Sequence, residues 1–211
     1  MNILGRLFLL ITLSVGVLNA SEISKVFSLQ DQEFADVTSN KLQKYKINEN
    51  LILSMKMSKV DYLDGYQGLS KPSKYNSSNF LKAVFINPYL KNWVYNEAIT
   101  LNMGDSYFYR EKNPSSLKFY DENGMVLSLN FKAGKICAGD KCLSSGFKGY
   151  RAFNIKIVNV NGTITFSVND KKIYSSKKRF SKLKSIEHTF FAYTSDGISD
   201  TLADFTLSEI K

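Results

Sequence analysis

Two runs of residues joined by the dipeptide Asn161-Gly162 constrain the fold of this 211-residue chain more than any other feature. Apolar side chains occupy every second position of 153–157 and of 164–168, with polar side chains between them. A period of two places the apolar side chains on one face of a β-strand. Asn-Gly favours a tight turn between such strands, because both central residues of a type I′ turn need positive φ. The sequence therefore predicts an antiparallel hairpin over 152–168.

The same pattern extends beyond the hairpin. Asn169-Asp170 predicts a second turn, and 172–175 then forms the third strand of a meander. Further strands are predicted at 51–57, 81–86, 97–101, 107–109, 117–120, 125–131, 190–193 and 203–210. One or two short helices at most are expected, with a candidate over 89–94, because Pro88 suits the first turn of a helix. Short strands separated by turn residues are typical of sandwiches and barrels, so we expect an all-β, antiparallel fold.

The first 20 residues have the three parts of a cleavable signal peptide. Arg6 supplies a positive start, 7–17 is an uncharged apolar run, and the small Ala20 precedes the expected cleavage site. The alternative, a retained anchor, would need roughly 20 apolar residues to cross a bilayer, and this run is about half as long. We therefore expect a periplasmic or secreted protein with no membrane span after cleavage, in which 21–211 form a single domain.

The chain contains two cysteines, Cys137 and Cys142, which flank the turn residues Gly139-Asp140. Apolar alternation before them and a turn between them predict the tip of a hairpin. Export to an oxidising compartment makes a disulfide the expected state of this pair. A redox-active pair is the alternative, but its usual pattern has two residues between the cysteines, and four separate them here.

The charge of the chain is basic, with a net value of +9. Loss of 1–20 would lower it to +8, because Arg6 is the one charged side chain among them. Seven basic residues and no acidic residue lie in one short stretch: Lys171, Lys172, Lys177, Lys178, Arg179, Lys182 and Lys184. Such a field favours an anionic partner. Export argues against nucleic acid and favours an anionic glycan, lipid head groups or an acidic protein face. The alternative is a solvated loop that keeps the protein soluble.

The segment 150–211 resembles the concanavalin A-like lectin and glucanase superfamily. The resemblance rests on the strand that ends at Asn161-Gly162, on 164–168, on 169–174 and on the closing segment 200–210, with 51–57 fitting an early core strand. It implies an antiparallel β-sandwich of the jelly-roll type. This fold hosts lectins, hydrolases and adhesive or scaffold modules, so it constrains function only loosely.

The sequence lacks the residue patterns that several classes of enzyme need for catalysis. Enzymes of the resembled superfamily that cleave glycosidic bonds use two carboxylates, which alternate along one strand in its glucanases, and none of the eight glutamates has that spacing. His188 is the only histidine, which excludes zinc sites built on several histidines. We interpret it as a polar residue at a strand end. No catalytic residue and no cofactor are predicted, and a glycoside hydrolase with an unrecognised site is the minor alternative.

A calcium site has three candidate ligands, Asp196, Asp200 and Asp204, on and beside a loop that contains Gly197. Calcium takes six to eight oxygen ligands, and three carboxylates fall short of that number. Asp-Gly is also an ordinary turn sequence. We therefore predict no metal site.

A glycan-binding site usually sets exposed aromatic rings beside polar side chains. The candidates for such a site are Tyr62, Asp64, Tyr66, Tyr75 and Trp93. The alternative is that these amphipathic rings cover the edge of the core.

These patterns favour an exported, non-catalytic binding module of the cell envelope. Like a lectin, it would bind a glycan, or else another anionic component of the envelope. The alternative hypothesis is a structural subunit of a periplasmic protein assembly, such as a flagellar-motor or secretion-associated structure. The sequence does not determine the oligomeric state.

Overall fold

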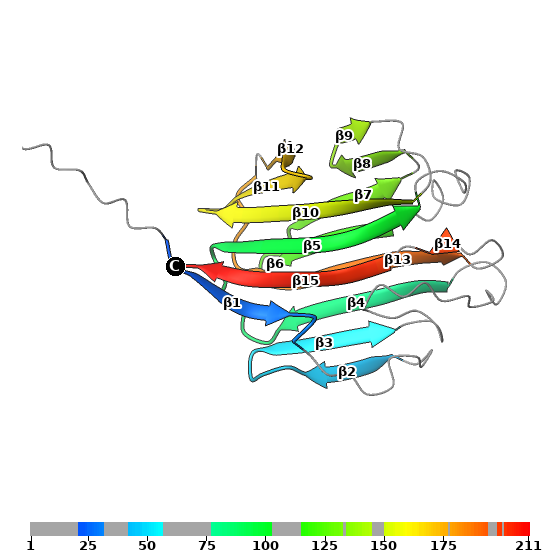
Figure 1. The fold of residues 1–211 in the computed structure, drawn as a ribbon. Helices are drawn as coiled ribbons and strands as arrows, with labels where there is room; N and C mark the ends of the chain where they lie inside the picture. The colour runs from blue at the N-terminus through cyan, green and yellow to red at the C-terminus, as the bar shows by residue number, and fades with distance from the viewer. Residues whose placement is uncertain are drawn as a thin grey trace, which may run out of the picture.

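The computed structural model describes residues 21–31, 42–56, 77–102, 115–132, 134–144, 150–176, 178–193, 198–199 and 201–211. These residues form strands β1–β15 in two antiparallel sheets that stack face to face (Figure 1). The all-β sandwich expected from the sequence is thereby confirmed. Over the same ranges no segment is helical, so none offers the long apolar helix with which a chain could cross a membrane.

The first sheet has six strands, and its two long central pairings join β5 to β10 and β15. All neighbouring strands in it are antiparallel. Their order is β1 (Ile23–Ser28), β15 (Thr201–Ile210), β5 (Trp93–Asn102), β10 (Tyr150–Val160), β11 (Thr163–Val168) and β12 (Lys171–Ser175). One edge of the sheet is therefore β1 and the other is β12.

The second sheet has nine strands, and β13 lies near its middle. Their order is β2 (Gln43–Lys46), β3 (Leu51–Lys56), β4 (Ser77–Phe85), β13 (Leu183–Tyr193), β6 (Ser115–Asp121), β7 (Val126–Lys132), β8 (Lys135–Ala138) and β9 (Lys141–Ser144), with β14 (Ile198–Ser199) paired to β13. Strands far apart in sequence are thus neighbours: β13 lies between β4 and β6, and β15 lies between β1 and β5.

The predicted meander is confirmed as β10, β11 and β12. Asn161 and Gly162 have φ values of 51° and 83°, and Asn169 and Asp170 have φ values of 46° and 61°. Both connections therefore have positive φ at their two central residues, as type I′ turns require. These turns align the apolar face of β11 with that of β10 and direct it into the core.

The core lies between the two sheets and contains a cluster of aromatic rings. Trp93 of β5 stacks on Phe119 of β6 across the sandwich, with 5.2 Å between the ring centroids. Tyr95 stacks on Phe205 of β15 in its own sheet at 5.5 Å and packs edge-on against Phe119 of the other sheet at 5.3 Å. All four side chains are buried. Burial of one large apolar side chain contributes about 1.5–3 kcal/mol, so contacts of this kind hold the two sheets together.

The helix expected over 89–94 is wrong, because residues 93 and 94 begin strand β5. The inward-facing positions of β5 alternate strictly and are Trp93, Tyr95, Glu97, Ile99 and Leu101. Burying this face against the second sheet requires a period of two. That requirement outweighs the local preference of Pro88 for the first turn of a helix.

The predicted disulfide between Cys137 and Cys142 is confirmed, with an S–S distance of 2.08 Å. It links β8 to β9 across a turn in which Gly139 has a φ of 60°. Closing a loop of this size stabilises the fold by about 2 kcal/mol. A Cβ atom placed on Gly139 would lie 3.7 Å from the ring of Tyr174. The hairpin tip of the second sheet therefore reaches β12, the edge strand of the first.

Candidate functional site

A groove of about 1290 Å³ lies where β12 approaches the β6–β7 and β8–β9 turns. We call it the edge groove. It is lined by residues 123–127, which span the β6–β7 turn and the start of β7, and by Asp140 and Lys141 at the β8–β9 turn and the start of β9. Residues 172–175 of β12, together with Lys178 and Arg179, complete the lining. Both sheets and the segment after β12 thus contribute walls.

The segment that follows β12 is held in place by hydrogen bonds to the meander. The amide of Ser176 donates to the carbonyl of Ile164 (2.8 Å), and its hydroxyl accepts from the Ile164 amide (3.0 Å). The amide of Phe180 donates to the carbonyl of Gly162 (2.8 Å), and its buried ring packs edge-on against Trp93. The two basic residues that precede Phe180 are therefore presented on an anchored backbone.

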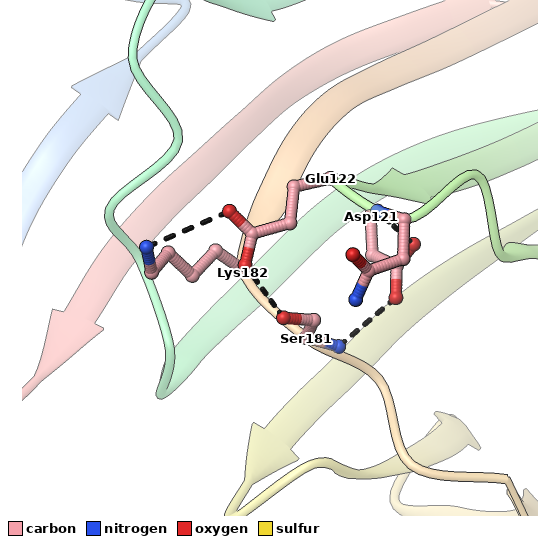
Figure 2. A network of polar contacts seen from close by, with 5 residues as sticks. Asp121, Glu122, Ser181 and Lys182 are labelled. Carbon is pink, nitrogen blue, oxygen red and sulfur yellow. Dashed lines mark hydrogen bonds and ion pairs between the residues drawn. The ribbon is translucent and has the colours of Figure 1, made fainter.

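Asp121 ties the same segment to the β6–β7 turn. Its carboxylate is buried at the end of β6 and accepts hydrogen bonds from the amides of Asn123 (2.9 Å) and Met125 (2.7 Å) through Oδ1. Through Oδ2 it accepts from the amide of Ser181 (3.0 Å), as Figure 2 shows. One carboxylate thus fixes the turn that forms one wall of the groove and the segment that carries its cations.

A second, more exposed contact lies beside Asp121. The Ser181 hydroxyl donates to Glu122 Oε1 (2.7 Å), and Lys182 Nζ lies 3.5 Å from Glu122 Oε2 (Figure 2). The hydrogen bond from Ser181, followed by the charge of Lys182, lowers the pKa of the Glu122 carboxyl. Glu122 therefore strengthens the link between turn and segment at neutral pH, and the contribution is lost as pH falls through its lowered pKa.

A smaller groove of about 460 Å³ continues from the edge groove past Arg179. We call it the side groove. Its lining includes the β10–β11 turn at Asn161 and Gly162, together with Lys91 and Lys182. Asn123 and Arg179 line both grooves.

The predicted basic stretch is divided by the fold. Lys172, Lys178 and Arg179 line the edge groove, and Arg179 and Lys182 line the side groove. Lys171 and Lys184 are exposed but line neither groove, and Lys177 lies outside the described residues. Lys91 and Lys141 join the site from distant parts of the sequence. No local pattern in the sequence signalled either of them.

Gly162 lets Arg179 lie across the β10–β11 turn. A Cβ atom at this position would lie 2.4 Å from Arg179 Cγ and 3.0 Å from the carbonyl oxygen of Phe180. Such distances are far below normal contact, so only a residue without a Cβ fits beneath the arginine. Because Gly162 also has positive φ, both space and backbone conformation require glycine here.

We expect Gly162→Ala to destabilise the protein more than Gly124→Ala does. Both glycines have a φ of 83°, but a Cβ at Gly124 would meet nothing within 4 Å. Backbone strain alone costs about 1–2 kcal/mol, and forcing Arg179 and the Phe180 carbonyl aside adds at least about 1 kcal/mol. Urea unfolding of the two variants measures the difference. Equal losses would show that Arg179 moves away without cost.

The aromatic candidates for a glycan site have different outcomes. Trp93 is wrong, because its ring is completely buried between the sheets and stacked on Phe119. Tyr62, Asp64, Tyr66 and Tyr75 lie outside the described residues. The ring that lines the edge groove is instead Tyr174, half-buried on β12 and packed edge-on against Phe166. The sequence predicted Tyr174 as a strand residue next to Ile173. The lysines beside it were the only other feature that could have indicated a binding site there.

Of the three calcium candidates, the structure describes Asp204. Asp196 and Asp200 lie outside the described residues. Asp204 lies on β15 and accepts a hydrogen bond from the amide of Gln30 (3.2 Å). Burial raises the pKa of its carboxyl. Within the described ranges, no three acidic, histidine or cysteine side chains are grouped as a metal site would need.

His188 corrects a further expectation, because it lies within β13 and is buried rather than at a strand end. Its Nε2 lies 3.1 Å from Oε1 of Glu97, across the sandwich, and both side chains are almost completely inaccessible. Glu97 Oε2 accepts a hydrogen bond from the Tyr95 hydroxyl (2.8 Å). Burial and the neighbouring glutamate raise the pKa of Tyr95 well above its usual range. This polar cluster joins the two sheets inside the core, where solvent does not reach it.

Comparisons with known proteins bear on the fold. No protein-family model and no curated protein sequence matches the chain. Among solved structures, the Emp47p carbohydrate recognition domain is 10% identical with a TM-score of 0.51, covering 82% of this chain and 90% of that domain. A structure described as an endo-acting O-glycanase of human gut microbiota, active in mucin breakdown, is 7% identical with a TM-score of 0.50, covering 89% and 100%. At these identities the likeness is one of fold. The chain thus has an antiparallel β-sandwich fold of the jelly-roll type, which is the fold that its resemblance implied.

Proposed function

We propose that the protein is an exported carbohydrate-binding module that holds a glycan in the edge groove. The observation that carries this proposal is the lining of the groove, in which the ring of Tyr174 lies among the charged and amide side chains of Asn123, Lys141 and Lys172. Sugars offer apolar C–H faces to aromatic rings and hydroxyl groups to polar side chains. A ring placed beside hydrogen-bonding side chains in a concave site matches both.

The support from fold similarity is limited to the architecture. The Emp47p domain is described as a carbohydrate recognition domain, and its sandwich is the fold in which we propose glycan binding here. Because one fold hosts many functions, the groove itself carries the argument.

The number and positions of the acidic residues in the two grooves support binding without catalysis. Among the described residues that line the two grooves, the carboxylates are Asp140 in the edge groove and Glu122 in the side groove. Glycosidases use two carboxylates that flank one scissile bond. Glu122 is also engaged by Ser181 and Lys182. We therefore expect a bound glycan to leave the protein uncut.

Export forms part of the proposal and rests on residues 1–20. The bond between Cys137 and Cys142 agrees with an oxidising compartment. Cell fractionation followed by intact-mass measurement tests this part. The expected product lies in the periplasm or the medium and begins at Ser21, and a cytoplasmic protein that retains Met1 would contradict it.

The test of glycan binding is calorimetric titration of the purified protein with a panel of polysaccharides, with reducing ends measured in parallel. We expect saturable binding to at least one polysaccharide and no release of reducing ends. Tyr174→Ala should weaken binding by up to roughly tenfold, which corresponds to one aromatic contact. Tyr89→Ala is the matched control, because Tyr89 is 41% exposed and lines neither groove.

Three results would contradict the proposal. If no polysaccharide bound, the proposal that the ligand is a glycan would be wrong. If Tyr174→Ala and Tyr89→Ala lost equal affinity, the edge groove would not be the binding site. Steady release of reducing ends would replace the binding module with an enzyme.

A further inference from the structure

The two grooves are adjacent, because Arg179 and Asn123 line both of them, and we call the two together the path. The path begins between β12 and the disulfide-bonded β8–β9 turn. It continues past the β6–β7 turn and ends beside the β10–β11 turn. A ligand that follows it must therefore pass Arg179.

The side chains along this path carry an excess of positive charge. Its cationic residues are Lys91, Lys141, Lys172, Lys178, Arg179 and Lys182, and its carboxylates are Asp140 and Glu122. Among the described residues, Lys182 alone of these six has a carboxylate within ion-pair distance. Cations gathered along a concave surface create a positive potential that attracts anions.

Arg179 is the best placed of these cations to recognise an acid group. Its stem lies over Gly162, and the next residue, Phe180, is anchored by its buried ring and its amide. A guanidinium offers a planar fork of donors that pairs with a carboxylate or a sulfate through two hydrogen bonds. An anchored backbone beside the arginine reduces the conformational entropy that this pairing costs.

We propose, on the basis of the proposed function, that the ligand is a polysaccharide bearing repeated acid groups, which runs from the edge groove to the side groove across Arg179. A polymer fits better than one acidic sugar, because each exposed ion pair raises affinity by only about fivefold or less. Several pairs distributed over both grooves are needed for firm binding. Affinity should therefore rise with chain length until both grooves are filled.

The experiment compares glycans that share a backbone and differ in charge. Polygalacturonate is measured against its methyl ester, and dextran sulfate against dextran, by calorimetry with the purified protein. We expect the charged member of at least one pair to bind ten times more tightly or better. We also expect its affinity to fall as salt rises from about 50 to about 300 mM, because salt screens exposed charges.

Variants locate the recognition. Arg179→Ala should weaken binding of the acidic glycan by about fivefold, the upper limit for one exposed ion pair. Arg179→Lys should recover only part of the affinity, because it keeps the charge and loses the fork. Lys184→Ala is the control, since it removes the same charge from an exposed residue that lines neither groove, and it should change affinity less than twofold. Lys172→Ala with Lys178→Ala repeats the test if Arg179→Ala fails to fold.

The outcomes separate this inference from the function on which it rests. Equal binding of the charged and neutral members of each pair would overturn the acidic ligand and leave glycan binding intact. Equal losses in the Arg179 and Lys184 variants would overturn the path across Arg179. Binding of inorganic polyphosphate as tight as that of the acidic glycans would show that charge alone is recognised, and would overturn both proposals.

Discussion

His188→Leu is expected to lower the free energy of unfolding by about 3–5 kcal/mol, as removal of one partner from a buried ionisable pair does. The imidazole faces Glu97 across the sandwich, with 1% and 0% of the two side chains exposed. Without it, the carboxyl of Glu97 stays buried with the Tyr95 hydroxyl as its hydrogen-bond partner among the described residues. Urea unfolding followed by circular dichroism measures the loss.

Two further variants show whether the loss comes from the buried pair. Lys25→Ala breaks an ion pair to Asp31 whose side chains are 59% and 51% exposed, and should cost less than about 1 kcal/mol. Adding Glu97→Leu to His188→Leu removes both polar partners, so the double variant should be more stable than His188→Leu alone. A loss for His188→Leu as small as that for Lys25→Ala would contradict the role of the pair.

Asp121→Ala is the second large effect that we expect. It removes the acceptor of three backbone amides, those of Asn123, Met125 and Ser181, at a site where the carboxylate itself is buried. Hydrogen bonds to charged groups contribute about 1.5–3 kcal/mol each, and solvent can satisfy part of what is lost. We therefore expect a net loss of about 3 kcal/mol in unfolding free energy, together with at least a tenfold loss of glycan affinity.

The affinity loss tests whether Asp121 shapes the groove. Asp121→Asn keeps an acceptor for the turn amides but turns an amide donor toward Ser181, so it should release the 178–182 segment while leaving the turn in place. We expect it to lose most of the glycan affinity at a smaller cost in stability. Asp31→Asn is the control for charge, because Asp31 is an exposed carboxylate that lines neither groove. If Asp121→Asn bound glycan as well as the unaltered protein, the groove would not depend on this tether.

Much of the sandwich could be predicted from the sequence because its strands alternate. The strand over 163–168 and its two flanking turns were predicted residue for residue. The short strands β1, β2 and β9 were missed, since each has four to six residues and little apolar alternation. The first half of β13 was missed for another reason. It carries Ser185 and His188, whose partners come from other strands.

The candidate site was predictable in one of its parts. The charge of 171–184 predicted an anion-binding set, which stays a prediction, and three of its members, Lys172, Lys178 and Arg179, line the edge groove. The opposite walls could not be inferred, because the β6–β7 and β8–β9 turns are brought to β12 by the stacking of two sheets. Trp93 illustrates the converse error. A tryptophan occurs both in binding sites and in cores, so its residue type alone does not predict whether the ring is exposed. The position of Trp93 on the inward face of β5 shows that this ring is buried.

The positions of β13 and β15 have a consequence for how the chain reaches its folded state. Each lies inside a sheet between strands made much earlier, so neither sheet can close until the last residues of the chain are available. Pairings over such long sequence separations form slowly. A partly synthesised chain therefore stays unfolded. Passage through a narrow translocation channel would require an unfolded chain. Order of synthesis alone could then delay folding until after the export that we propose.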